Sequence, residues 1–278
     1  MSCATAQSCE DAVVVVDRKV LHSAANPKCC CTQEDSSPAP AASPAAPEPM
    51  CMEQLLSQLQ VAFEAEKAQG HVIDNNQDPE SFRKLNNTVQ GLLKAYTSCN
   101  SRDWQQYALF NDVHYVRNLV HANEDFELIV LCWKSGQVSR VHNHGSSHCW
   151  LAVLDGRMRE AQYRRADGLP TGTNNPQEQA GSQVEVELTH STDMQVGDVG
   201  YINDHLALHN VGCFTGPEEL RTQQTADSGS EGQAGGWRLE GGVTLHLYSP
   251  PIRRVKIYEE GTVLERTPGY YSKGGVRL

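Results

Sequence analysis

The sequence predicts a mainly β fold, a small antiparallel barrel or jelly roll that follows a group of N-terminal helices. Two features predict it. After residue 111, short runs rich in Val, Ile, Leu, Thr and Tyr are separated by Gly, Asn and Asp, as in a succession of strands and turns. Before that point, apolar residues recur at helical spacing. With 278 residues, 39% hydrophobic and 21% charged, the chain can bury one core, and we expect one domain with extensions.

The first 50 residues are expected to stay outside this core. Residues 36–49, SSPAPAASPAAPEP, alternate Pro, Ala and Ser, a composition that cannot build a packed interior. We therefore predict a disordered extension and linker over residues 1–50 and a folded domain over residues 51–278.

Three helices are predicted at the front of this domain. The first covers 51–69 and ends at Gly70, and the second covers roughly 80–98. A short third helix follows, capped by Asn100 or Ser101. The apolar residues that predict them are Leu55, Leu59, Ala62, Phe63, Val89, Leu92, Leu93, Tyr96, Trp104, Tyr107 and Phe110.

Ten strands are predicted in the remainder of the domain. They cover 113–120, 126–134, 138–143, 147–154, 157–164, 184–190, 199–203, 206–211, 242–248 and 253–258. Two polar insertions, at 165–183 and 215–241, interrupt the series and are expected to be mobile surface loops.

Charge and hydropathy exclude several classes of partner. The formal net charge is −11, and Lys and Arg are scattered, so the chain has no basic surface for nucleic acid or anionic lipid. The longest apolar runs, such as AVVVV at 12–16 and LIVLCW at 128–133, are far shorter than a bilayer span. We expect small-molecule partners, no nucleic acid and no membrane.

The cysteines and the N-terminus indicate the compartment. Six of the ten cysteines lie in the first 51 residues and three of them are adjacent, so a regular disulfide framework is difficult to form. Acidic Glu10 and Asp11 stand where a secretory signal would be basic. We interpret the cysteines as reduced thiols and expect a cytoplasmic protein.

A histidine pair in VHNHGSSHCWLAVLDG, residues 141–156, suggests a metal site. His142 and His144 are two residues apart on a predicted strand, so they project from the same face and can hold one ion. A third ligand must come from another strand. His209 in YINDHLALHNVG is the favoured candidate, and His205 and His148 are the alternatives. For His148 we favour a packing role.

The spacing around this pair matches the first motif of the cupin superfamily, G-x5-H-x-H-x3,4-E-x6-G. The matching residues are Gly136, His142, His144 and Gly156, with Cys149 in place of the glutamate. His209 falls at the histidine of the second cupin motif, which fits loosely. An all-histidine site leaves Fe(II) or a similar ion its full charge, which favours an anionic ligand such as a thiolate. Imidazole ligands alone suit Zn, Cu, Ni or Fe, so they do not identify the metal.

Five stretches then point to one family. They are Y-x-R-N-L-V at 115–120, L-C-W at 131–133, H-x-H-x3-H-C at 142–149, Y-I-N-D-x3-L-H at 201–209 and L-H-L-Y-S-P-P at 245–251. With them, the chain resembles cysteine dioxygenase, a family of thiol dioxygenases within the cupin superfamily, from about residue 85 to residue 260. The resemblance implies a cupin jelly roll that oxidises L-cysteine with O2 to cysteine sulfinic acid at a three-histidine, non-haem Fe(2+) centre, in cysteine catabolism and taurine biosynthesis.

The resemblance also implies roles for residues outside the metal site. Cys149 would form a thioether crosslink with the ring of Tyr248 beside the iron, with His246 as a further catalytic residue. Thr244, at a position where the family usually has serine, shares strand parity with His246 and Tyr248, so all three are expected to face the cavity.

Substrate binding is expected on the strand at 113–120. Arg117 offers a planar fork suited to the carboxylate of cysteine, and Tyr115 shares its face. The alternative for Arg117 is a surface salt bridge. Trp133 and Leu131 are expected to wall the pocket.

Two other functions stay open. One is a dioxygenase of mercaptopropionate or cysteamine, although Arg117 disfavours cysteamine, which has no carboxylate. The other is a non-catalytic metal-binding cupin. We expect a monomer.

Overall fold

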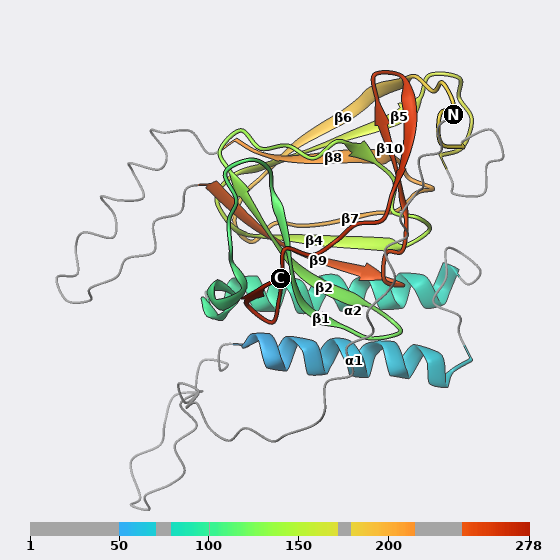
Figure 1. Cartoon of the computed structure of the whole chain (residues 1–278). Helices are drawn as coiled ribbons and strands as arrows, with labels where there is room; N and C mark the ends of the chain where they lie inside the picture. Colours follow the sequence, from blue (N-terminus) through green and yellow to red (C-terminus); the bar gives the residue numbers. More distant parts are fainter. Residues whose placement is uncertain (1–49, 71–78, 100, 172–178, 215–240) are drawn as a thin grey trace, which may run out of the picture. The chain divides into compact units, whose positions relative to one another are not determined.

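The computed structural model describes residues 50–70, 79–99, 101–171, 179–214 and 241–278 (Figure 1). Of the predicted N-terminal extension, residues 1–49 lie outside the described residues. So do the middle of the insertion at 165–183 and most of the insertion at 215–241.

Two α-helices precede the strands, as predicted. Helix α1 covers Met52–Ala68 and helix α2 covers Pro79–Ser98. At the start of α1, the backbone N–H of Cys51 donates to the side-chain oxygen of Gln54, 2.9 Å away. Gly70 follows α1 with a left-handed φ of 79°, as expected for a glycine that ends a helix. No helix among the described residues is both long and apolar enough to cross a membrane.

The predicted third helix is a 3-10 helix, η1, over Asp103–Tyr107. Of the two predicted caps, Asn100 lies outside the described residues, and Ser101 is wrong because Arg102 is the residue that precedes η1. Phe110 lies beyond the end of η1. The side chain of Asp103 accepts hydrogen bonds from the backbone of Met52 and the hydroxyl of Tyr96, so it connects η1 to both helices.

The strands form two sheets. The first has the order β13-β12-β1-β2-β9-β4-β7 and the second has the order β11-β10-β3-β8-β5-β6. Their bounds are β1 Val116–Ala122, β2 Glu127–Lys134, β3 Val141–His142, β4 His148–Asp155, β5 Met158–Arg165, β6 Val186–Met194, β7 Val199–Ile202, β8 Leu208–Cys213, β9 Gly241–Ser249, β10 Val255–Glu259, β11 Thr262–Arg266, β12 Ser272–Lys273 and β13 Val276–Arg277. Apart from the parallel β1–β12 pair, the strand pairs are antiparallel, as in a jelly roll.

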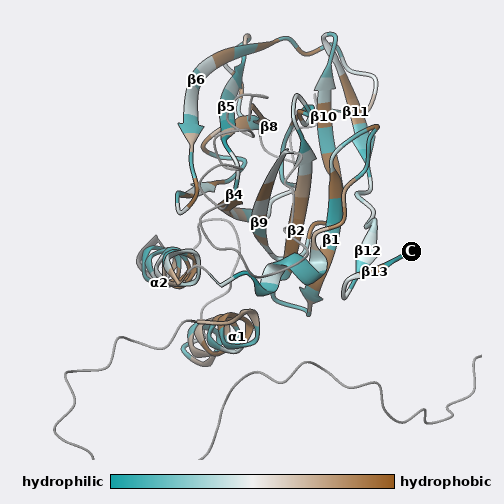
Figure 2. Cartoon of the chain, turned by 90° about the vertical axis from the view of Figure 1, so that its left-hand side faces the viewer, coloured by the Kyte–Doolittle hydropathy of each residue, from teal (hydrophilic) through white to brown (hydrophobic). Residues whose placement is uncertain are grey.

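The seven-stranded sheet is the middle layer of the domain. Helices α1 and α2 cover one of its faces, and the six-stranded sheet faces the other (Figures 1 and 2). Strands β2, β4 and β9 are buried almost throughout, which explains why they are nearly continuous apolar runs without alternation. Toward the helices the sheet presents Leu128, Val130, Cys132, Trp150, Ala152, Leu245 and Leu247. Toward the second sheet it presents Ile129, Leu131, Trp133, Cys149, Leu151, Val153 and Tyr248.

The structure corrects several predicted bounds. Strand β1 begins at Val116, so Tyr115 precedes the strand rather than lying in it. The strand expected at 138–143 is reduced to Val141–His142, because Val138 makes only an isolated bridge to Gly212. Strands β11, β12 and β13 were not predicted. The last two have two residues each, too few for a period of two to be visible in the sequence.

Candidate metal centre

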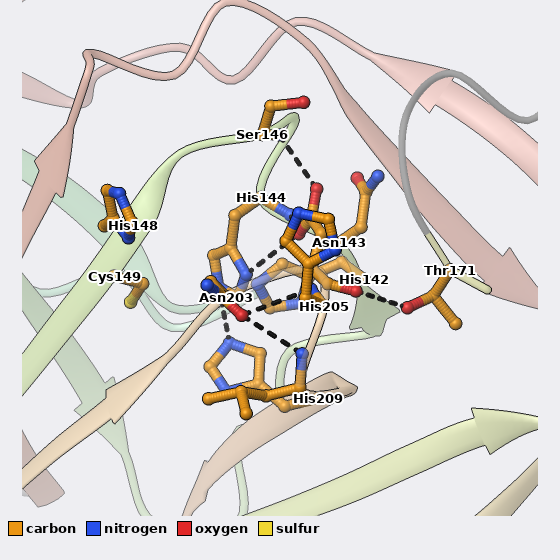
Figure 3. A network of polar contacts seen from close by, with 12 residues as sticks. His142, Asn143, His144, Ser146, His148, Cys149, Thr171, Asn203, His205 and His209 are labelled. Carbon is orange, nitrogen blue, oxygen red and sulfur yellow. Dashed lines mark hydrogen bonds and ion pairs between the residues drawn. The ribbon is translucent and has the colours of Figure 1, made fainter. Parts of the chain in front are cut away.

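Three histidines converge between the two sheets. His142 on β3 and His209 on β8 are cross-strand partners, and His144 follows β3 in the next turn. Their ligand nitrogens all lie within 4.8 Å of one another, and Nε2 of His144 is 3.0 Å from Nε2 of His209. Figure 3 shows the three rings grouped together. His205, the alternative third ligand, is exposed and is not part of this group.

The outer nitrogens of two of these rings have close acceptors. Nδ1 of His142 lies 2.8 Å from the carbonyl oxygen of Arg140, and Nδ1 of His209 lies 2.7 Å from Oε1 of Glu160 on β5. An N–H donated to these acceptors fixes the tautomer in which Nε2 carries the free lone pair. Both rings therefore turn a metal-binding atom inward.

A buried carboxylate organises the turn that carries His144. Asp204 accepts the backbone N–H groups of His144 at 2.6 Å and Ser146 at 2.8 Å, and its Oδ1 is 3.4 Å from Nδ1 of His144. The carbonyl oxygen of Asp204 accepts the hydroxyl of Thr171, in the described part of the first insertion. Burial alone would raise the pKa of Asp204, but the contacts with His144 lower it below its usual value.

Gly145 is required by this turn. Its φ is 62°, in the left-handed region, and a Cβ there would lie 2.1 Å from the carbonyl oxygen of Arg254. A glycine directly after His144 thus lets the chain leave β3 and pass against the neighbouring backbone.

The electrostatics of the cluster suit a metal ion. Burial lowers the pKa of His142 well below its usual value, and the proximity of His209 and His144 adds to the effect. Burial also lowers the pKa of His209, although Glu160 opposes it. Neutral imidazole is the form that binds metals, and inward-facing Nε2 atoms this close together match the donor set of a divalent transition metal. The residues present fit such an ion.

Cys149 and Tyr248 are neighbours beside the histidines. They are cross-strand partners on β4 and β9, and the ring centroid of Tyr248 is 6.1 Å from that of His144. Burial raises the pKa of Cys149 and of Tyr248 well above their usual values, so both carry their protons at neutral pH.

A chain of polar contacts runs along β9 toward Tyr248. The indole N–H of Trp133 donates to Oγ1 of Thr244 at 2.9 Å. The same hydroxyl lies 3.0 Å from Nε2 of His246, and Nδ1 of His246 lies 3.1 Å from the hydroxyl of Tyr248. Thr244 has a methyl group that serine lacks, and these contacts form in its presence.

His148 lies outside this cluster. Its ring stacks on Phe82 of α2 with centroids 4.6 Å apart, and its Nδ1 is 2.7 Å from the hydroxyl of Tyr201. These contacts agree with the packing role that strand parity favours.

Arg117 reaches inward from β1, and its side chain is 15% exposed. Its Nη2 is 3.3 Å from Oε1 of Glu127, and its Cζ is 5.5 Å from the centre of the Tyr248 ring. Arg117 does form a salt bridge, but not at the surface, because its partner Glu127 is buried inside the domain. The alternative of a surface salt bridge is therefore wrong. Tyr115 lies nearby, stacked on Trp133 with ring centroids 4.3 Å apart.

Three carboxylates of the site were missed from the sequence. The sequence could have indicated Glu127 and Glu160, because each lies two residues from an inward-facing residue on its strand. Strand periodicity therefore predicts that both side chains point inward. Asp204 lies in the turn before β8, where no periodicity applies.

The two facing sheets, with three histidines from β3, its following turn and β8, define a metal-binding cupin. The family model described as cysteine dioxygenase type I matches residues 83–218. Cysteine dioxygenase type 1 of Danio rerio is 32% identical over 192 residues, 68% of this chain and 78% of that protein. The Homo sapiens protein of the same name is 30% identical over the same shares of both chains.

A solved protein with a double-stranded beta-helix domain from Klebsiella pneumoniae aligns at 16% identity with a TM-score of 0.32, over 61% of this chain and 98% of that one. The two cysteine dioxygenase type 1 proteins identify the family of this chain. It belongs to the cysteine dioxygenase family and is an enzyme of that family. The resemblance seen in the sequence and the predicted fold class are confirmed.

Proposed function

We propose that this chain oxidises L-cysteine with O2 to cysteine sulfinic acid at one Fe(2+) ion held by His142, His144 and His209, and so controls cysteine catabolism. One observation carries the proposal: three convergent imidazoles lie beside both a Cys149–Tyr248 pair and an inward-facing arginine. The reaction adds both atoms of O2 to the sulfur, so the substrate is the source of all the electrons and no further reductant is needed.

Iron(II) bound by the three imidazoles would supply Lewis acidity toward the substrate thiol and electron transfer to dioxygen. The protein residues provide the binding and the proton positions. Arg117 binds the substrate carboxylate through its guanidinium group, and the stacked ring of Tyr115 closes one side of the site. With the carboxylate fixed, the sulfur is held in one position.

The polar chain on β9 orients the proton of Tyr248. Because Trp133 donates to Thr244, the hydroxyl of Thr244 is free to donate to Nε2 of His246. Nδ1–H of His246 then donates to the phenol oxygen, which leaves the phenol proton free to point into the cavity. Burial lowers the pKa of His246 well below its usual value, which keeps this neutral tautomer through the physiological range. Tyr248 thus donates a hydrogen bond to the reacting oxygen atoms.

The proposal includes a thioether between Cys149 and Tyr248. The S–H bond of Cys149 and a ring C–H bond of Tyr248 break, an S–C bond forms, and O2 accepts the two electrons and two protons. The cross-strand pairing of the two residues supports this step. Catalytic roles are assigned to Tyr248, Cys149 and His246.

The wider setting is part of the same proposal. The partners are L-cysteine and O2, and the protein acts as a monomer in the cytoplasm. The five described cysteines, Cys51, Cys99, Cys132, Cys149 and Cys213, are free of disulfides, which supports a reducing compartment. Residues 1–50 are proposed as an extension outside the catalytic domain.

The test is oxygen uptake by the iron-loaded protein with L-cysteine, together with identification of the product by mass spectrometry. We expect cysteine sulfinic acid with one O2 consumed per cysteine. His209→Ala should abolish both iron binding and uptake, whereas His205→Ala should keep both. A protein that binds iron but consumes no oxygen with any thiol would instead be a non-catalytic metal-binding cupin.

A further inference from the structure

Glu127 is a buried acid that the proposed function does not use. It lies on the inward face of β2, and its side chain is 1% exposed. Three donors reach its carboxylate: Nη2 of Arg117 and the backbone N–H of Ile252, both at 3.3 Å, and the hydroxyl of Tyr270. Both carboxylate oxygens therefore have a donor, and one of the donors is the cationic guanidinium of Arg117. The domain thus holds an acidic side chain beside the arginine that is proposed to bind the substrate carboxylate.

The position of Glu127 places it next to the proposed substrate site. It is the cross-strand partner of Tyr248, which is in turn the partner of Cys149. These three residues form one row across β2, β9 and β4, and the guanidinium of Arg117 lies over the ring of Tyr248. A substrate held by Arg117 beside Tyr248 would also lie near Glu127.

Glu127 occupies only part of the guanidinium. The contact is a single 3.3 Å distance rather than a bidentate pair. Nε of Arg117 is buried and has no hydrogen-bond partner among the described residues. A buried N–H without an acceptor is costly, so this edge of the guanidinium is suited to an acceptor supplied by a ligand.

Resting on the proposed function, we propose that Glu127 is a specificity-determining residue. Its carboxylate shares Arg117 with the substrate carboxylate, and it attracts a substrate ammonium group. The pair of Arg117 and Glu127 has a net charge near zero, so an anionic group gains less from it than from arginine alone. Glu127 therefore favours thiols that carry an amine, L-cysteine above all, over thiols that carry only a carboxylate.

The test compares the dissociation constants of L-cysteine, 3-mercaptopropionate and cysteamine for the iron-loaded protein by anaerobic calorimetry, where no turnover occurs. In Glu127→Gln, 3-mercaptopropionate should bind more tightly and cysteamine more weakly, each on the order of tenfold. Glu127→Met also removes the charge, and it should shift the two affinities in the same directions. Tyr270→Phe removes a donor to Glu127 but keeps the charge, so the ratio of the two dissociation constants should stay within about twofold of wild type.

The proposal would be overturned if the ratio of the dissociation constants of 3-mercaptopropionate and cysteamine stayed at its wild-type value in both Glu127→Gln and Glu127→Met. It would also be overturned if Tyr270→Phe changed this ratio as much as those two variants do. The oxygen uptake of the wild-type protein with L-cysteine separates this result from failure of the proposed function. If uptake and sulfinic acid are present and the ratio does not move, the role of Glu127 is wrong. If neither is present, the catalytic function is wrong.

Discussion

Cys149 and Tyr248 face each other across adjacent strands β4 and β9, with both side chains in the layer between the two sheets. Directly opposed residues of an antiparallel pair have Cβ atoms about 4.5–5.5 Å apart, within reach of a link between a sulfur and an aromatic ring. The pairing itself, fixed by the register of two buried strands, is what brings the sulfur to the ring.

We expect protein incubated with iron, L-cysteine and O2 to lose the mass of two hydrogens and to give a second band on a denaturing gel. Both changes should be absent in Cys149→Ser and in Tyr248→Phe. Cys213→Ser, which alters another buried cysteine of the same layer, should retain them. Intact mass spectrometry decides the matter, and a mass loss that persists in Cys149→Ser would rule out this crosslink.

The hydrogen bond between Glu160 and His209 is expected to strengthen metal binding. A carboxylate acceptor at 2.7 Å makes the ring more basic, and a neutral amide does so less. Glu160→Gln should therefore weaken iron binding by about 10–100-fold, measured by competition with a chelator. Glu187→Gln, the same change on an exposed part of β6, serves as the control. Equal affinities in the two variants would contradict the role of Glu160.

Arg117 and Glu127 are expected to be coupled in stability. Removing one member of a buried ion pair leaves the other charge without compensation, at a cost of about 3–5 kcal/mol. Arg117→Met should lower the free energy of unfolding toward the lower end of that range, since the arginine is 15% exposed. Adding Glu127→Gln should restore part of the loss, and urea unfolding of the four proteins measures the coupling. Additive effects would show that the two side chains do not interact.

His246 should make the metal-free protein less stable in acid. Its pKa is lowered in the folded state by burial, so its contribution to stability is complete above the unfolded pKa of about 6.5. As the pH falls below that value, the unfolded chain takes up a proton that the folded chain resists. His246→Gln should therefore lose less stability than wild type between about pH 7.5 and about pH 5.5, by at most about 1.4 kcal/mol per pH unit.

Urea unfolding at the two pH values measures this difference. His205→Gln, at an exposed position, is the control and should behave like wild type. If His246→Gln lost as much stability as wild type between these two pH values, His246 would not be a source of the acid sensitivity.

Two glycines allow a matched test of the turn after β3. Gly145 and Gly136 both have left-handed φ angles, of 62° and 83°, but a Cβ at Gly136 would meet nothing within 4 Å. Gly136→Ala should lose about 1–2 kcal/mol, the cost of the backbone angle alone. Gly145→Ala should lose more, because its Cβ would also collide with the backbone of Arg254, and it should weaken iron binding through His144. If Gly136→Ala and Gly145→Ala lowered the free energy of unfolding by similar amounts, the expected collision between residue 145 and the backbone of Arg254 would be excluded.

The sequence indicated much of this site, because several of its residues follow strand periodicity. Thr244, His246 and Tyr248 alternate along β9 and do make one chain of contacts. For His142 and His144 the expected pair was found although β3 ends at His142, so the turn rather than the strand brings His144 into the cluster.

The parts that could not be predicted depend on distant pairing. Asp204 holds the His144 turn from 60 residues away, and Tyr270 reaches Glu127 across 143 residues. Neither contact follows from local spacing, since the fold alone brings these segments together. The limits of strands also shift by a few residues, which removed Tyr115 from the strand that was expected to position it.

The parallel pairing of β12 with β1 has a consequence for biosynthesis. The backbone of Arg117 accepts the N–H of Tyr271, and Ser272 donates to the side chain of Asn118. Apart from Tyr270 in the same segment, every other described contributor to the site precedes residue 260, so a ribosome delivers the histidines well before residues 270–277. A nascent chain would then bring its three histidines together first and position Arg117 last, so we expect a truncation beyond Gly269 to weaken the proposed substrate binding by Arg117 more than metal binding by the histidines.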